Sequence, residues 1–112
     1  MAHASLYHWR VCGGPAETVR GEWLVSRVYA VNGRAEPALH HARRAYELCV
    51  AHVLGGFDLA YAYEGMARAL ALAGEPYDDW HARAVEAGAA IPDEEDRAVF
   101  AADLDAPPWP SI

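Results

Sequence analysis

Residues 28–49 read VYAVNGRAEPALHHARRAYELC, and a similar pattern returns at residues 69–90 as ALALAGEPYDDWHARAVEAGAA. In both stretches a segment with helical spacing of apolar residues ends at a glycine, Gly33 or Gly74, and an alanine-rich segment follows. Glycine readily adopts the left-handed conformation that closes a helix, and alanine favours helix while letting helices approach closely. A helix, a turn and a second helix that recur in this way are typical of a stacked helical repeat.

The sequence predicts an all-α fold of about six helices. Apolar residues recur at helical spacing in each segment, glycine or proline marks most boundaries, and no segment shows the sustained alternation of a β-strand. The third predicted helix has a row of small residues, Ala38, Ala42, Ala45 and Cys49, that we expect to be buried. The expected helices cover roughly residues 2–11, 16–32, 36–53, 58–73, 76–90 and 93–103.

These helices are expected to form one domain over residues 1–112. Asp58 is the expected N-cap of the fourth helix, and Val99, Phe100 and Leu104 are the expected apolar contacts of the last one. The domain divides into an unpaired helix at 1–12, a hairpin at 16–53, a second hairpin at 57–91, a capping helix at 93–105 and a tail at 106–112, in which Trp109 is expected to pack back onto the last helices.

Composition and charge argue against nucleic-acid and membrane partners. The chain of 112 residues has a formal net charge of −7, whereas binding to a phosphate backbone needs clustered lysine and arginine. The sequence has no run of about 18 apolar residues that could span a bilayer and no recognisable secretory signal. Cys12 and Cys49 do not make a disulfide framework. We therefore expect a cytoplasmic protein with reduced thiols.

The two hairpins resemble the tetratricopeptide repeat, a family that packs two antiparallel helices per repeat with small residues where they cross. When Gly33 is aligned with the family's turn glycine, Ala38 and Ala45 fall on its two small positions in the second helix, and Ser26 falls on a small position in the first. Gly33 and Gly74 are 41 positions apart, against about 34 in the family. The spacing resembles a long-helix variant of bacterial regulators and scaffolds, and the stretch is similar to small actinobacterial proteins of this type.

The resemblance implies a scaffold that binds a protein or peptide partner, without catalysis and without a cofactor. In such repeats the first helix of each hairpin lines a concave groove. Because Arg27 and Arg68 occupy equivalent positions, the two guanidiniums would hold a carboxylate of an acidic or C-terminal peptide group. The alternative is that both arginines pair with Glu22, Glu64 or neighbouring acids on a solvated face. The groove positions carried over from the family are Arg20, Trp23, Arg27, Tyr61, Glu64 and Arg68.

Other chemistry has weaker support in the sequence. No two histidines have the i, i+4 spacing of a helical zinc site, so we expect no metal. Cys12 lies one helical turn after His8, which leaves a reactive pair as a minor alternative, whereas Cys49 is expected in the core. The second hypothesis for function is a small-molecule-binding or enzymatic helical protein. Its sign would be a closed apolar cavity on which His8, His41 or Tyr61 converge.

The first expected helix, at residues 1–12, has no partner within the repeat pattern. Its apolar residues Leu6 and Trp9 would face solvent at the open end of the stack, where terminal repeats normally carry a polar cap. Either a second copy covers this end or upstream sequence is missing. We expect a homodimer with Leu6 and Trp9 at the interface.

Overall fold

The computed structural model describes residues 14–106, and every regular element in that range is an α-helix. The all-α prediction is therefore confirmed for these residues, with five helices close to five of the six expected ranges. The expected helix at residues 2–11 and Trp109 lie outside the described range. The helices are α2 (Pro15–Val31), α3 (Ala35–Ala51), α4 (Gly56–Leu72), α5 (Asp78–Ala89) and α6 (Glu94–Asp105). None of them has the length and apolar character needed to cross a bilayer.

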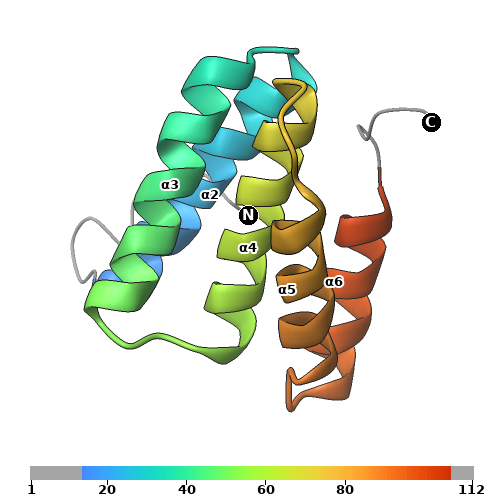
Figure 1. The fold of residues 1–112 in the computed structure, drawn as a ribbon. Helices are drawn as coiled ribbons and strands as arrows, with labels where there is room; N and C mark the ends of the chain where they lie inside the picture. Colours follow the sequence, from blue (N-terminus) through green and yellow to red (C-terminus); the bar gives the residue numbers. More distant parts are fainter. Residues whose placement is uncertain (1–13, 107–112) are drawn as a thin grey trace.

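Successive helices run in opposite directions, so α2 and α3 form one antiparallel hairpin and α4 and α5 form another (Figure 1). Helix α4 is central, because it packs against each of the other four described helices. Helix α2 packs against both α3 and α4, and α6 packs against α4 and α5. The first helices of the two hairpins are therefore neighbours, and α6 lies on the far side of α4 from α3.

Both predicted glycine turns are confirmed. Gly33 and Gly74 have φ angles of 75° and 76°, in the left-handed region where a side chain is strained. After α2, Gly33 N donates to Ala30 O at 3.0 Å and Arg34 N donates to Tyr29 O at 2.8 Å. These bonds satisfy carbonyls that the end of a helix leaves without partners.

The turn after α3 has the same geometry but places a valine in the left-handed position. Val53 has a φ of 53°, and Leu54 N donates to Cys49 O at 2.8 Å. A side chain in this conformation costs about 1–2 kcal/mol. Val53 is 90% exposed, so its packing does not offset that cost.

We expect Val53→Gly to raise the free energy of unfolding by up to about 1 kcal/mol, because relief of strain exceeds the gain in unfolded-state freedom. Urea denaturation measures the difference. As a control, Val50→Gly in the last turn of α3 should lower stability, because that position is helical and glycine disfavours helix. A Val53→Gly protein no more stable than the wild type would contradict the assigned strain.

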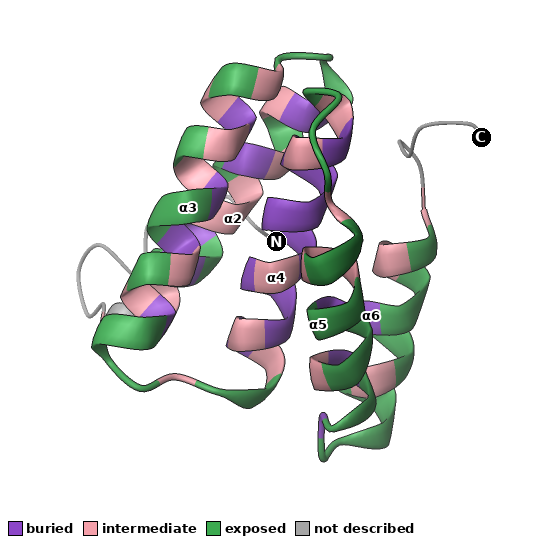
Figure 2. Cartoon of the chain, viewed as in Figure 1, coloured by how far each residue is buried: buried purple, intermediate pink, exposed green. Residues whose placement is uncertain are grey.

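Small residues allow the close packing of the first hairpin. The predicted row of Ala38, Ala42, Ala45 and Cys49 is buried, as expected. Helix α4 is buried around most of its circumference, and Figure 2 shows buried colouring along its later turns and a mixture of buried and intermediate colouring near its start. Because four helices surround it, polar side chains on α4 are also enclosed, and Glu64 and Arg68 are among them.

Two local predictions were wrong. Asp58 is not an N-cap, because α4 begins at Gly56 with Gly55 as its N-cap, and Asp58 instead lies in the first turn and binds Arg20. Val99 is not a core contact, since it is 50% exposed. Neither the preference of aspartate for N-cap positions nor the apolar character of valine specifies which neighbouring helix a residue meets.

Helix α6 is fixed by one aromatic residue and a close approach to α5. Phe100 is 2% exposed and packs edge-on against Tyr61 of α4, with ring centroids 4.8 Å apart. A Cβ at Gly88 of α5 would lie 2.4 Å from the Phe100 ring, so only glycine leaves room for it. At the start of α6, Asp93 accepts a hydrogen bond from Asp96 N at 2.8 Å. These contacts hold α6 beside the face shared by α2 and α4.

Candidate functional site

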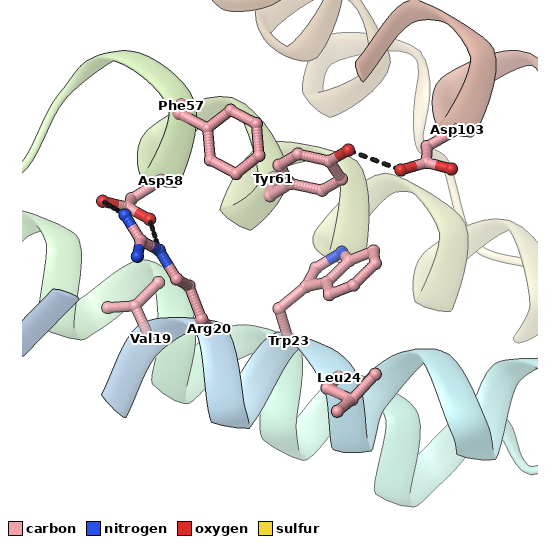
Figure 3. Close-up of a pocket in the computed structure, with 8 residues that line it drawn as sticks. All are labelled: Val19, Arg20, Trp23, Leu24, Phe57, Asp58, Tyr61 and Asp103. Atoms are coloured by element: carbon pink, nitrogen blue, oxygen red, sulfur yellow. Dashed lines mark hydrogen bonds and ion pairs between the residues drawn. The ribbon is translucent and has the colours of Figure 1, made fainter. Parts of the chain in front are cut away.

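A pocket of about 200 Å³ opens between α2, α4 and α6 (Figure 3). Its surface is mostly apolar, with charged side chains at its two ends. Three of the predicted groove residues, Arg20, Trp23 and Tyr61, line it. The lining residues are Val19, Arg20, Trp23 and Leu24 of α2, Phe57, Asp58 and Tyr61 of α4, and Asp103 of α6.

Aromatic rings in fixed positions form the middle of the pocket. Tyr61 contacts Trp23 in an edge-to-face arrangement and Phe57 in a tilted one, each with ring centroids 4.8 Å apart. The Trp23 indole Nε1 donates to Glu64 Oε1 at 2.7 Å. Gly65 makes room for the indole, because a Cβ there would lie 3.3 Å from Trp23 Cδ1. The aromatic wall is therefore held by hydrogen bonding and packing before any ligand binds.

An ion pair closes one end of the pocket. Arg20 Nε donates to Asp58 Oδ1 at 2.8 Å, and the guanidinium carbon lies 6.0 Å from the centre of the Phe57 ring. The hydrogen bond with Asp58 raises the pKa of Arg20, and the charges of Glu17 and Asp96 act in the same direction. The guanidinium of Arg20 is therefore already paired with a carboxylate of this chain.

A phenol and a carboxylate meet at the opposite end (Figure 3). The Tyr61 hydroxyl donates a hydrogen bond to Asp103 Oδ2. Burial raises the pKa of Tyr61, and the hydrogen bond to Asp103 raises it further. Tyr61 therefore remains a neutral hydrogen-bond donor to Asp103, whose charge also acts on Arg68.

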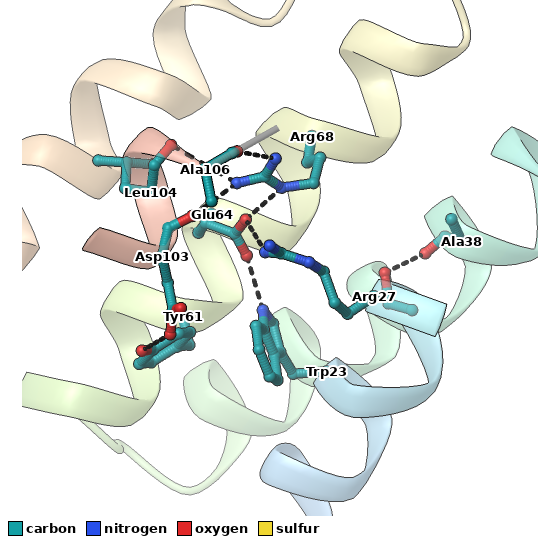
Figure 4. A network of polar contacts seen from close by, with 10 residues as sticks. Trp23, Arg27, Ala38, Tyr61, Glu64, Arg68, Asp103, Leu104 and Ala106 are labelled. Carbon is teal, nitrogen blue, oxygen red and sulfur yellow. Dashed lines mark hydrogen bonds and ion pairs between the residues drawn. The ribbon is translucent and has the colours of Figure 1, made fainter. Parts of the chain in front are cut away.

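A buried ionic network borders the pocket (Figure 4). Glu64, which has 0% exposure, accepts from Arg27 Nη1 at 3.2 Å and from Arg68 Nε, in addition to the Trp23 indole. Arg68 is 2% exposed. Burial lowers the pKa of Arg68, whereas the charge of Glu64 opposes that effect. One carboxylate thus compensates two guanidiniums in a site shielded from water.

Arg68 also binds the last turn of α6. Its Nη1 donates to Ala106 O at 2.7 Å and its Nη2 donates to Asp103 O at 2.9 Å. Carbonyl groups at the C-terminus of a helix carry partial negative charge, which a guanidinium compensates. The contact therefore fixes the end of α6 and, with it, the position of Asp103 at the pocket.

The predicted groove residues divide into two adjoining groups. Arg20, Trp23 and Tyr61 line the pocket, whereas Arg27, Glu64 and Arg68 belong to the buried network, together with the Trp23 indole nitrogen. Arg27 and Arg68 do come together, on the same oxygen of Glu64. The pairing with Glu64 agrees with the alternative hypothesis, in which both arginines pair with acids of this chain. That hypothesis placed the pairs on a solvated face, whereas Glu64 and Arg68 are buried.

Five lining residues are not among the predicted groove residues: Val19, Leu24, Phe57, Asp58 and Asp103. Asp103 had a detectable signal, since it lies between Phe100 and Leu104 on the apolar side of α6. An acid on a face that packs against a core is unusual.

Histidine and cysteine lie away from the pocket in the part of the chain that the structure describes. His41 Nδ1 contacts Glu22 Oε1 at 2.7 Å, on the side of α2 that faces α3. No cluster of three metal-binding side chains occurs among the described residues. Cys49 is buried as expected, and burial raises its pKa to about 11, so it remains a protonated thiol. Of the other histidines, His40, His52 and His81 lie within the described range. His3 and His8, like Cys12, lie outside it.

The proposed dimer contacts Leu6 and Trp9 also fall outside residues 14–106. The homodimer therefore stays a prediction, and the molar mass measured by light scattering on the full chain would test it. A monomeric mass would contradict it.

A scan against models of protein families finds no match to this chain, and searches of curated proteins and of solved structures likewise find none.

Proposed function

We propose that this chain is a non-catalytic scaffold of tetratricopeptide type that binds a peptide segment of a partner protein. In this proposal the pocket between α2, α4 and α6 receives one side chain of that segment. The observation that carries the proposal is a pre-formed aromatic pocket on the face shared by α2 and α4. A pocket held in its binding conformation does not lose conformational entropy when it is filled.

The packing of small residues supports the tetratricopeptide part of the proposal. Ser26, Ala38 and Ala45 are the residues aligned with the family's small positions, and all three are buried. Ser26 Oγ donates to Ala38 O at 2.7 Å, which requires close approach of α2 and α3. In such repeats the first helices of the hairpins, α2 and α4 here, line the groove.

The size and chemistry of the pocket favour binding of a side chain. Its volume of about 200 Å³ is smaller than that of typical small-molecule sites, which is about 300–1,000 Å³. The alternative of a Tyr- and His-lined ligand site finds Tyr61 but no histidine among the described residues of this pocket. A second pocket of about 660 Å³ between α5 and α6 has His81 but no tyrosine among its described lining residues. The raised pKa of Tyr61 also makes it a poor general base at neutral pH.

The proposal is tested by selecting binders from a random library of linear peptides against the full chain. Selected peptides should bind with affinities that fluorescence polarisation can measure. Phe57→Ala, which removes one wall of the pocket, should weaken binding about tenfold or more. The control is Val28→Ala, an exposed change on α2, which should leave binding unchanged. Failure to select any binder, or equal binding by the Phe57→Ala protein, would refute the proposal.

A further inference from the structure

We infer that the pocket receives a lysine or arginine side chain from a basic segment of the partner protein. The inference rests on the proposed function and names the chemistry of the bound segment. It differs from the expectation drawn from the sequence, in which paired arginines hold an acidic group. The two expectations differ because the arginines of the groove already form ion pairs within this chain, whereas Asp103 forms none among the described residues.

The arginines of the groove are already compensated by carboxylates of this chain. Arg27 and Arg68 share Glu64, and Arg68 is enclosed beneath the end of α6. Arg20 is held by Asp58 through two hydrogen bonds. An incoming carboxylate would have to displace one of these internal acids, with no net gain of ion pairs.

The carboxylate of Asp103, in contrast, forms no ion pair with a side chain among the described residues. Within that part of the chain its side chain accepts a hydrogen bond only from the neutral hydroxyl of Tyr61, and its charge also acts on Arg68. It faces the pocket from the end away from Arg20 (Figure 3). Asp96 lies two helical turns earlier on the same side of α6, and both Asp96 and Glu17 act electrostatically on Arg20. Among the residues that line the pocket, two are acidic, Asp58 and Asp103, and one is basic, Arg20.

The shape of the pocket suits a side chain with an apolar stem and a cationic end. The stem of a lysine or arginine would lie against Trp23 and Tyr61, whose rings form the middle of the pocket. The cation would meet Asp103 and the aromatic rings, which attract cations through their π faces. The net charge of −7 further favours the approach of a basic segment.

The experiment is a double-mutant cycle on the full chain with the peptides obtained by selection. The anchor lysine is replaced by norleucine, which keeps the aliphatic stem and removes the charge. The protein change is Asp103→Asn, which keeps an acceptor for Tyr61. The matched control is Asp105→Asn, which makes the same change in charge on the exposed side of α6. Peptides with an arginine anchor use citrulline in place of norleucine.

The selected peptides should be enriched in lysine or arginine at the anchor position, which enters the pocket. Norleucine in the peptide and Asp103→Asn in the protein should each weaken binding about tenfold, and the two together by little more than either alone, because both remove the same interaction. The Asp105→Asn protein should bind like the wild type.

Neutral or acidic anchors, or a norleucine peptide that binds unchanged, would overturn the inference and leave the proposed function standing. A complete lack of peptide binders would overturn both. If Asp103→Asn instead changes the molar mass by light scattering, a second copy occupies the pocket, and the inference is also overturned.

Discussion

Replacing Glu64 with alanine should lower the free energy of unfolding by about 3–5 kcal/mol. The change removes the carboxylate that compensates both Arg27 and Arg68. It also leaves the Trp23 indole without its acceptor. The buried guanidinium of Arg68 and the partly exposed guanidinium of Arg27 would then lose the carboxylate that both bind, and weakly compensated buried charge is costly.

Urea or thermal denaturation of the purified variants measures this effect. The matched control is Glu86→Ala on α5, where the glutamate is exposed, and its effect should lie within about 0.5 kcal/mol. Glu64→Gln should fall between the two, since it keeps hydrogen-bond acceptors and removes the charge. A Glu64→Ala protein as stable as the Glu86→Ala protein would show that the network does not contribute to stability.

Replacing Phe100 with alanine should cost about 3–5 kcal/mol. The ring is buried between Tyr61 of α4 and Gly88 of α5, and its removal leaves a cavity at the point where α6 contacts both helices. Because α6 also carries Asp103, the same change should weaken peptide binding at the pocket.

Val99→Ala is the control for this prediction, because it removes a half-exposed side chain from the adjacent position of the same helix. Its effect on stability should be within about 0.5 kcal/mol. Equal losses of stability in the two variants would mean that α6 is not held by the Phe100 contact, and the description of α6 as a fixed wall of the pocket would have to be abandoned.

The sequence contains most of the information needed for the helical hairpins. Gly33 and Gly74 were predictable as turns because they follow periodic apolar segments, and the left-handed conformation they adopt is open to glycine. The buried row that includes Ala38 and Ala45 was also predictable, because its spacing puts small residues on one face of a helix. Local chemistry determines both features.

The site was only partly predictable, because it depends on which helices surround α4. Arg20, Trp23 and Tyr61 were expected on a shared face and do line one pocket. Glu64 and Arg68 were expected on the same face, but α6 encloses Arg68 and binds its guanidinium through backbone carbonyls. Spacing along one helix contains no information about a later helix, so the burial of this pair could not be deduced.

The most direct test of the central claim is to map the binding site of a selected lysine-containing peptide by two-dimensional NMR on the full chain. The indole Nε1–H of Trp23 donates to Glu64 and its ring lines the pocket, so its resonance reports on both. We expect the largest shift changes at this indole and at the backbone amides of Phe57, Tyr61 and Asp103. Changes confined to the exposed faces of α3 and α5, with the Trp23 indole unaffected, would contradict the account.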